Sequence, residues 1–206
     1  MVEPSRRECL AAIAGGTVAA LAGCQWNAET SDEQPGDGRE RVTEYEVASV
    51  RNPDGKALFT EGETLPTPRE TDDRPRVYGH TYLTSGDDLD DVTFAETSEA
   101  RTLASFAEAT ALDGEESVYL FTTAIRACSE VRLQWVEIDA SGPSAQFCRT
   151  LRPADVECRA TAYETTGFAI RFPFAGDRFS GHGAGTSSSC GRPPRPEPFD
   201  PTEGAP

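Results

Sequence analysis

Four cysteines are the residues of this sequence best suited to covalent chemistry inside a folded domain. They are Cys128, Cys148, Cys158 and Cys190. An even number of cysteines in an exported chain predicts disulfides, and each disulfide typically stabilises a domain by about 2–4 kcal/mol. Four cysteines allow three pairings. We expect Cys148–Cys158, closing the loop around Pro153, and Cys128–Cys190, attaching the C-terminal tail to the sheet.

The two histidines, His80 and His182, suggest a rival use for the same cysteines. Together with thiolates they could bind zinc, but no C-x-x-C or H-x₃-H spacing is present. A blue-copper site needs two histidines, a cysteine and usually an axial methionine. The sequence holds one methionine, at its first position, and no histidine closely follows a cysteine. We therefore expect disulfides, no metal ligands and no cofactor.

The other polar residues match no catalytic motif. The sequence contains no G-x-S-x-G elbow and no glycine-rich phosphate loop, and neither histidine lies in a triad context. His80, between Tyr78 and Tyr82, is typical of a strand, and 180–183 (Ser-Gly-His-Gly) of a solvated loop. The carboxylates of Asp87, Asp88, Asp90 and Asp91 could bind Ca²⁺, but they lack the glycine and glutamate of an EF-hand loop, and an exposed acidic loop explains them equally.

The N-terminal segment carries the most specific motifs. Arg6 and Arg7 precede a run of small and apolar residues, Leu10–Gly23, that is too short to span a bilayer. An arginine pair before such a run is typical of twin-arginine export. The run ends in Leu-Ala-Gly-Cys24, which looks like a lipobox. We expect residues 1–23 to be a signal peptide, and a lipid on Cys24 to hold the mature chain at the extracytoplasmic face of the cell membrane.

The charge of the chain is strongly negative. Acidic residues outnumber basic ones by 35 to 19, for a net charge of −16. This balance argues against nucleic acid, whose phosphates must be neutralised by basic side chains. Lys56 is the single lysine. A hydrated acidic surface favours solubility in strong brine, where the Debye length of about 3 Å at 1 M salt screens the repulsion. The alternative is an acidic protein that binds cations or a basic partner.

Apolar patterning predicts a mainly β domain over residues 42–175. Strands are expected at 42–50, 56–60, 76–84, 92–95, 117–125, 131–138, 144–149 and 168–174. The turn residues at 51–55 suggest that the first two strands form a hairpin, and those at 85–88 suggest another turn. The apolar face changes near Trp135, which predicts a β-bulge. One helix is expected after a Ser98 cap, ending at Asp113-Gly114.

These elements indicate an antiparallel β-sandwich or open barrel with one short helix. Residues 24–41 are expected to be a disordered acidic tether, because they lack periodicity. Residues 176–206 are rich in Gly, Ser and Pro and are expected to be a low-complexity tail, pinned by Cys190.

The arginine pair, the lipobox at Cys24 and the acidic, lysine-poor body together resemble the lipoproteins that haloarchaea export by the twin-arginine route. The resemblance implies a location and a lipid on Cys24, and no active site. We expect a membrane-tethered module that binds an unknown protein or small molecule, or serves the cell envelope, and that is not an enzyme. The alternative is an envelope hydrolase with a site assembled from scattered residues. An exposed patch of Trp135 with Arg132 or Arg149 would favour binding.

Overall fold

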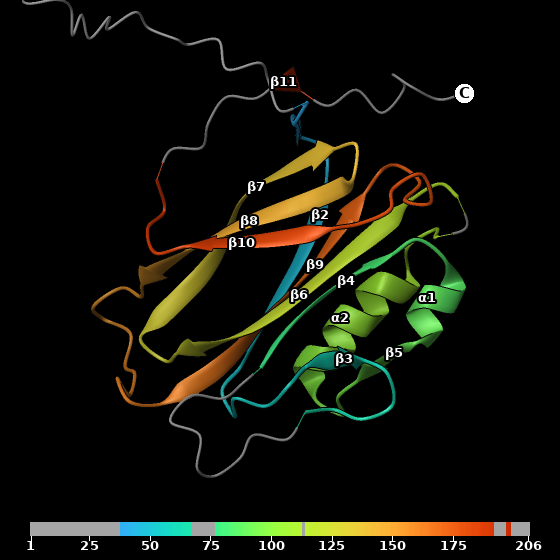
Figure 1. The fold of residues 1–206 in the computed structure, drawn as a ribbon. Helices are drawn as coiled ribbons and strands as arrows, with labels where there is room; N and C mark the ends of the chain where they lie inside the picture. The colour runs from blue at the N-terminus through green and yellow to red at the C-terminus, as the bar shows by residue number, and fades with distance from the viewer. Residues whose placement is uncertain (1–37, 67–76, 113, 192–196, 199–206) are drawn as a thin grey trace, which may run out of the picture. The chain divides into compact units, whose positions relative to one another are not determined.

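The computed structural model describes residues 38–66, 77–112, 114–191 and 197–198 (Figure 1). The expected signal peptide with Arg6 and Arg7, the lipidation residue Cys24 and most of the tether lie outside these residues. In the described ranges, no helix is long and apolar enough to cross a membrane. The domain is mainly β, as predicted, and its main strands form two separate sheets, so the chain adopts the sandwich.

The first sheet has five strands in the order β10-β8-β7-β1-β11. β7 pairs antiparallel with β8 and with β1, whereas β10 runs parallel to β8 and β11 parallel to β1. The sheet is therefore mixed, and it begins before the expected boundary at residue 42. Its strands are β1 (Glu40–Val42), β7 (Ser129–Asp139), β8 (Gly142–Leu151), β10 (Gly183–Ser187) and β11 (Glu197–Pro198).

The second sheet has four antiparallel strands in the order β2-β9-β6-β4. They are β2 (Glu46–Asn52), β4 (Tyr78–Leu83), β6 (Ser117–Arg126) and β9 (Tyr163–Phe172). β6 is buried along nearly its whole length. Tyr119 and Phe121 on one of its faces join the core between the two sheets, while Val118 and Leu120 join a second core. A strand with two covered faces explains why its sequence is apolar without alternation.

Helix α2 (Ser98–Glu108) lies over the other face of the four-stranded sheet, beside a small sheet of β3 (Phe59–Glu61) and β5 (Val92–Phe94) (Figure 1). The helix buries Leu103 against the four-stranded sheet. Its cap is Thr97, whose Oγ1 accepts a hydrogen bond from the Ala100 amide at 3.2 Å. The expected cap at Ser98 is therefore wrong by one residue.

The expected turn at 85–88 is instead the start of a short helix, α1 (Gly86–Asp90). Ser85 accepts a hydrogen bond from the Asp88 amide at 3.2 Å, and the Asp88 carboxylate accepts one from the Ser85 amide at 3.0 Å. This reciprocal capping satisfies amides that a short helix leaves without partners. The four aspartates therefore lie on a capped helix and its end.

The hairpin expected around residues 51–55 does not form. The chain does turn there, with Gly55 at φ +67° and its amide bonded to the Asn52 carbonyl at 3.4 Å. However, β2 pairs with β9, and β3 pairs with β5 on another layer. The segment after the turn leaves the four-stranded sheet because Leu58, which is fully buried, joins the core beneath α2.

The bulge expected near Trp135 is confirmed. The register with β8 shifts between Leu133, which pairs with Phe147, and Trp135, which pairs with Gln146. Because the bulge reverses the alternation, Leu133 before it and Val136 after it both reach the core between the sheets.

The segment after residue 175 belongs to the fold. β10 supplies the edge of the five-stranded sheet, and beyond it Gln134 Nε2 of β7 donates a hydrogen bond to the Gly191 carbonyl at 3.0 Å. The β-rich part therefore extends past the boundary that composition suggested, because backbone pairing needs no apolar side chains.

Candidate functional site

The two histidines of the chain meet in space. His80 lies on β4, and His182 immediately precedes β10. Their ring centres are 5.0 Å apart and the ring planes are nearly perpendicular, at 85°. β4 is one of the two edge strands of the four-stranded sheet, and β10 is one of the two edge strands of the five-stranded sheet. The sandwich therefore brings two distant segments together at one open side, which we call the β4–β10 seam.

Three tyrosines surround this histidine pair. Tyr119 stacks on His80 with ring centres 6.1 Å apart, and Tyr78 meets His80 edge-on at 5.7 Å. Tyr82 lies 6.2 Å from His182. Tyr78 is 59 % exposed, so the cluster reaches solvent. Because alternate residues of a strand share a face, the spacing of Tyr78, His80 and Tyr82 directs all three toward the seam.

The backbone on both sides of His182 is held in place. The Gly181 amide donates a hydrogen bond to the Ser141 carbonyl at 2.8 Å, and Tyr119 Oη donates one to the Gly183 carbonyl at 2.9 Å. These bonds connect the loop to the β7–β8 turn and to the central strand β6. The imidazole of His182 is exposed, but the backbone that carries it is fixed.

Burial favours the uncharged forms of His80 and of two neighbouring tyrosines. Burial, and to a smaller degree the neighbouring His182, lowers the pKa of His80, while Glu61 acts in the opposite direction. Burial raises the pKa of Tyr78, and it raises that of Tyr82 to about 12 even though Ser117 is hydrogen-bonded to this phenol. A neutral imidazole has one nitrogen with a free lone pair and one N–H, so it can accept and donate.

One polar atom of the cluster has no partner. The Nδ1 atom of His80 is buried, and within the described part of the chain it makes no hydrogen bond. A buried polar atom left without a hydrogen bond typically costs about 1–3 kcal/mol. Such an atom beside an exposed imidazole is suited to binding a ligand.

The four cysteines within the described residues are paired, but the expected pairing is wrong. The disulfides are Cys128–Cys158 and Cys148–Cys190, with Cα atoms 5.2 and 5.0 Å apart. The β6–β7 turn with Cys128 and the β8–β9 loop with Cys158 lie at the same end of the sandwich. Cys148 pairs in register with Ser187, which brings the segment that follows β10 alongside it. Because no thiolate remains, these cysteines cannot complete a zinc site with His80 and His182.

The acidic residues at 87–91 make no cation site among the described residues. Thr84 Oγ1 and the Thr84 amide each donate to Asp88 Oδ2 at 2.8 Å, so this carboxylate is occupied by its own helix cap. In the same ranges, no group of three or more His, Cys, Asp or Glu side chains is placed to hold a metal ion.

For the expected patch of Trp135 with Arg132 or Arg149, the strand register keeps Trp135 and Arg132 on one face of the sheet and separates Arg149 from them. Trp135 donates its indole N–H to Glu137 at 2.8 Å, and Arg41 lies over its ring at 5.6 Å. Arg132 forms an ion pair with Glu130. Arg149 pairs in register with Val131 and shares its face, which is turned toward the core, so it lies on the other side of the sheet from Trp135 and Arg132.

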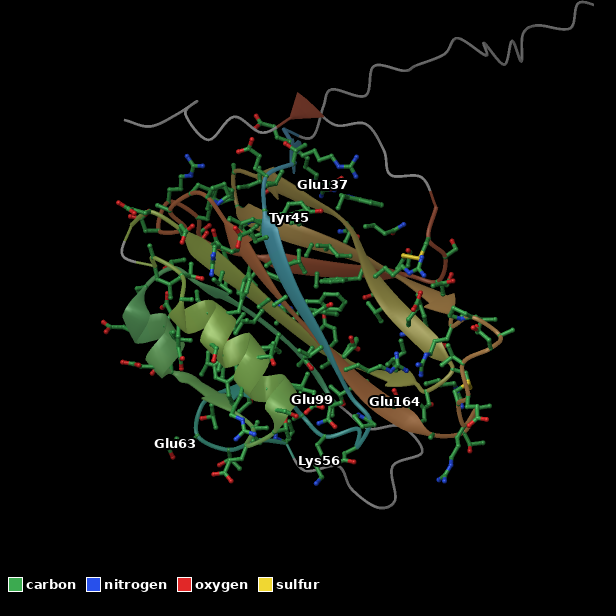
Figure 2. The ribbon with its side chains drawn as sticks, turned by 180° about the vertical axis from the view of Figure 1, so that it is seen from behind. Tyr45, Lys56, Glu63, Glu99, Glu137 and Glu164 are labelled. Carbon is green, nitrogen blue, oxygen red and sulfur yellow. A yellow bond between two sulfur atoms is a disulfide. The ribbon has the colours of Figure 1, made fainter. Side chains whose placement is uncertain are left out.

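A polar cleft of about 680 Å³ lies at the end of the sandwich that holds Glu164. In Figure 2 this is the end away from Glu137. Glu164 is paired with Arg51. Arg51 also donates to the Ser129 carbonyl at 2.9 Å and the Ala127 carbonyl at 2.8 Å. Its guanidinium thus joins β2, β9 and the β6–β7 turn, a structural role. The cleft is lined by Pro53, Ala127, Glu157, Cys158, Arg159, Ala162 and Glu164.

Sequence reasoning missed the histidine pair. It placed His80 on a strand and His182 in a solvated loop, and both placements agree with the structure. The available signal was the alternation of aromatic residues and histidine at 78, 80 and 82. Nothing in the local pattern connects that strand with residue 182, because the contact depends on which strands form the two sheet edges.

Comparison of the chain with protein-family models, with curated proteins and with solved structures found no match.

Proposed function

We propose that this chain is a lipid-anchored protein on the outer side of a cell membrane, and that its β-sandwich binds a ligand at the β4–β10 seam. The observation that carries the binding role is the meeting of His80 and His182 in an aromatic frame, with a buried imidazole nitrogen that has no partner. An aromatic site with a few polar groups is typical of ligand recognition.

The location is supported by two independent features. Arg6, Arg7 and the lipobox at Cys24 are typical of an exported lipoprotein. Two disulfides favour an oxidising compartment, because cytosolic thiols are normally kept reduced. The net charge of −16 favours solubility in concentrated salt.

The alternative, an envelope hydrolase, needs a nucleophile or an activated water beside a general base. Among the described residues, no hydrogen bond joins either imidazole to a hydroxyl or a carboxylate of the chain. The geometry therefore supports ligand binding more directly than catalysis.

Two measurements on native membranes test this proposal. Intact mass spectrometry should find a chain that begins at a lipidated Cys24 and gains four hydrogens on reduction. An unprocessed chain with free thiols would contradict the proposed location.

The second measurement is carbethoxylation of histidines by diethyl pyrocarbonate. His182 is exposed in the isolated protein and should react quickly there, and it should be protected in membranes where the site is occupied. Lys56, which is also exposed, controls for access of the reagent. Equal reactivity of His182 in membranes and in the purified protein would contradict a binding role for the seam.

A further inference from the structure

We infer that His80 and His182 bind a late first-row divalent metal ion, with Cu(II) preferred, between their imidazole rings. The inference rests on the proposed function, since it names the ligand class of the same seam. Four observations carry it: the separation of the rings, the unpartnered nitrogen, the open side of the pair and the fixed backbone around His182.

The separation of the rings fits a shared ion. Imidazole nitrogens bind such ions at about 2.0–2.1 Å, and two rings that are neighbouring ligands of one ion have centres about 4.5–5 Å apart, from the right angle of a tetragonal site to the wider angle of a tetrahedral one. The observed distance is 5.0 Å. An edge-to-face aromatic contact has a similar distance, so the ring geometry permits both readings and the nitrogen atoms must distinguish them.

The nitrogen atoms favour the ion. A purely packed histidine usually satisfies its buried nitrogen with a hydrogen bond. His80 Nδ1 is buried without one, on a ring that otherwise packs against Tyr119 and Tyr78. A metal ion would use the lone pair that the folded chain leaves free.

The exposure of the histidine pair makes this an open metal site, in which solvent completes the coordination. His182 and Tyr78 are exposed, and in the described part of the chain no third His, Cys, Asp or Glu joins the pair. Water or an oxygen ligand would fill the remaining positions, as in other open metal sites. Two nitrogen ligands bind weakly, so occupancy favours Cu(II), which stands highest in the affinity order of the divalent first-row ions.

The fixed backbone makes the two ligands available together. Residues 181 and 183 are both hydrogen-bonded, to the Ser141 carbonyl and to Tyr119 respectively. The loop therefore loses little freedom when an ion binds, which lowers the entropic cost of binding.

The test uses the full lipidated chain, extracted in detergent and carrying no histidine tag, titrated with CuSO4 against citrate, a competitor that binds only through oxygen. Because the acidic surface also binds Cu(II) through oxygen, the readout is the nitrogen superhyperfine structure of the electron paramagnetic resonance spectrum. We expect one Cu(II) per chain, coupled to two imidazole nitrogens.

Three variants give the comparison. His182→Gln and His80→Phe should each weaken Cu(II) binding at least tenfold and leave coupling to one nitrogen. Phe keeps a ring against Tyr119, so the second variant tests the nitrogens rather than the packing. Ser180→Ala, in the same exposed loop, should bind like the unaltered chain.

Absence of nitrogen coupling in the unaltered chain, or unchanged coupling in both histidine variants, would overturn the metal site. Membrane protection of His182 without Cu(II) binding would reject the metal while supporting the binding role. Cu(II) binding without protection in membranes would support the site and contradict the proposed function.

Discussion

The carbonyl oxygen of Gly181 occupies the space that a side chain at Gly142 would need. A Cβ built on Gly142 would overlap with that oxygen, and Gly142 also has φ +141°, a region that favours glycine. Gly142 begins β8, and Gly181 precedes His182. The β7–β8 turn thus determines how closely the loop that carries His182 can approach.

Gly142→Ala should therefore displace this loop. We expect a loss of stability of about 1–3 kcal/mol, because the new methyl group needs both a strained φ and a shift of neighbouring backbone. Urea unfolding measures the loss, and carbethoxylation of His80 should become faster as the loop moves away. Gly181→Ala is the control, since its added carbon would meet only an ordinary contact at 3.6 Å. Equal stability of the two variants would contradict this account.

Gly167→Ala should overpack the core beneath helix α2. A Cβ there would lie 2.6 Å from Leu58 Cδ1 and 2.8 Å from Leu103 Cδ1. We expect a loss of about 1–3 kcal/mol in the free energy of unfolding, because both leucines are fully buried. The matched control is Gly79→Ala on β4, where the nearest atom would be 3.5 Å away. The prediction fails if the two variants unfold at the same urea concentration.

Arg51→Met should separate the strands that its guanidinium joins. The change removes the donor of Glu164 and of the Ser129 carbonyl, and leaves the Ala127 carbonyl with its bond from Arg152 alone. We expect a loss of about 2–3 kcal/mol, since hydrogen bonds to charged groups contribute more than neutral ones. Arg132→Met should change stability by less than about 0.5 kcal/mol, because its pair with Glu130 is 62 % exposed on the arginine side. A loss equally small for Arg51→Met would show that these contacts are not stabilising.

Asp88 should make the free energy of unfolding depend on pH in the acidic range. Burial alone would raise the pKa of Asp88, but hydrogen bonds from Thr84 and Ser85 outweigh it and lower the pKa below its ordinary value of 3.8. The stability that Asp88 contributes is therefore present above pH 3.8 and is lost as the pH falls through its folded pKa. Asp88→Asn should be less stable than the unaltered chain at pH 7, and the difference should shrink toward pH 2.

Urea unfolding at fixed salt over this pH range measures the difference. Asp90→Asn is the control, because the Asp90 side chain makes no hydrogen bond within the described residues. A gap between Asp88→Asn and the unaltered chain that stays constant from pH 7 to pH 2 would contradict a lowered pKa.

Local sequence patterns predicted the elements well. Alternation located β4 and β9, continuous apolar character located the doubly covered β6, and the change of face at Trp135 located the bulge. These features depend on a few neighbouring residues and on whether a face is covered. Even the number of disulfides followed from the cysteine count, whereas the short helix α1 was taken for a turn because its capping residues are also turn formers.

What the sequence by itself determined is thus where the strands and the main helix occur and how many disulfides form; it also carries the export and lipidation motifs. Tertiary structure alone decided which strands pair and which cysteines are bonded. β2 pairs with β9 rather than with β3, and Cys148 bonds to Cys190 rather than to Cys158. An alternating strand is compatible with many neighbours, and only the packing of the whole sandwich selects one. The same selection placed β4 and β10 each at an edge of its sheet, and it brought His80 next to His182.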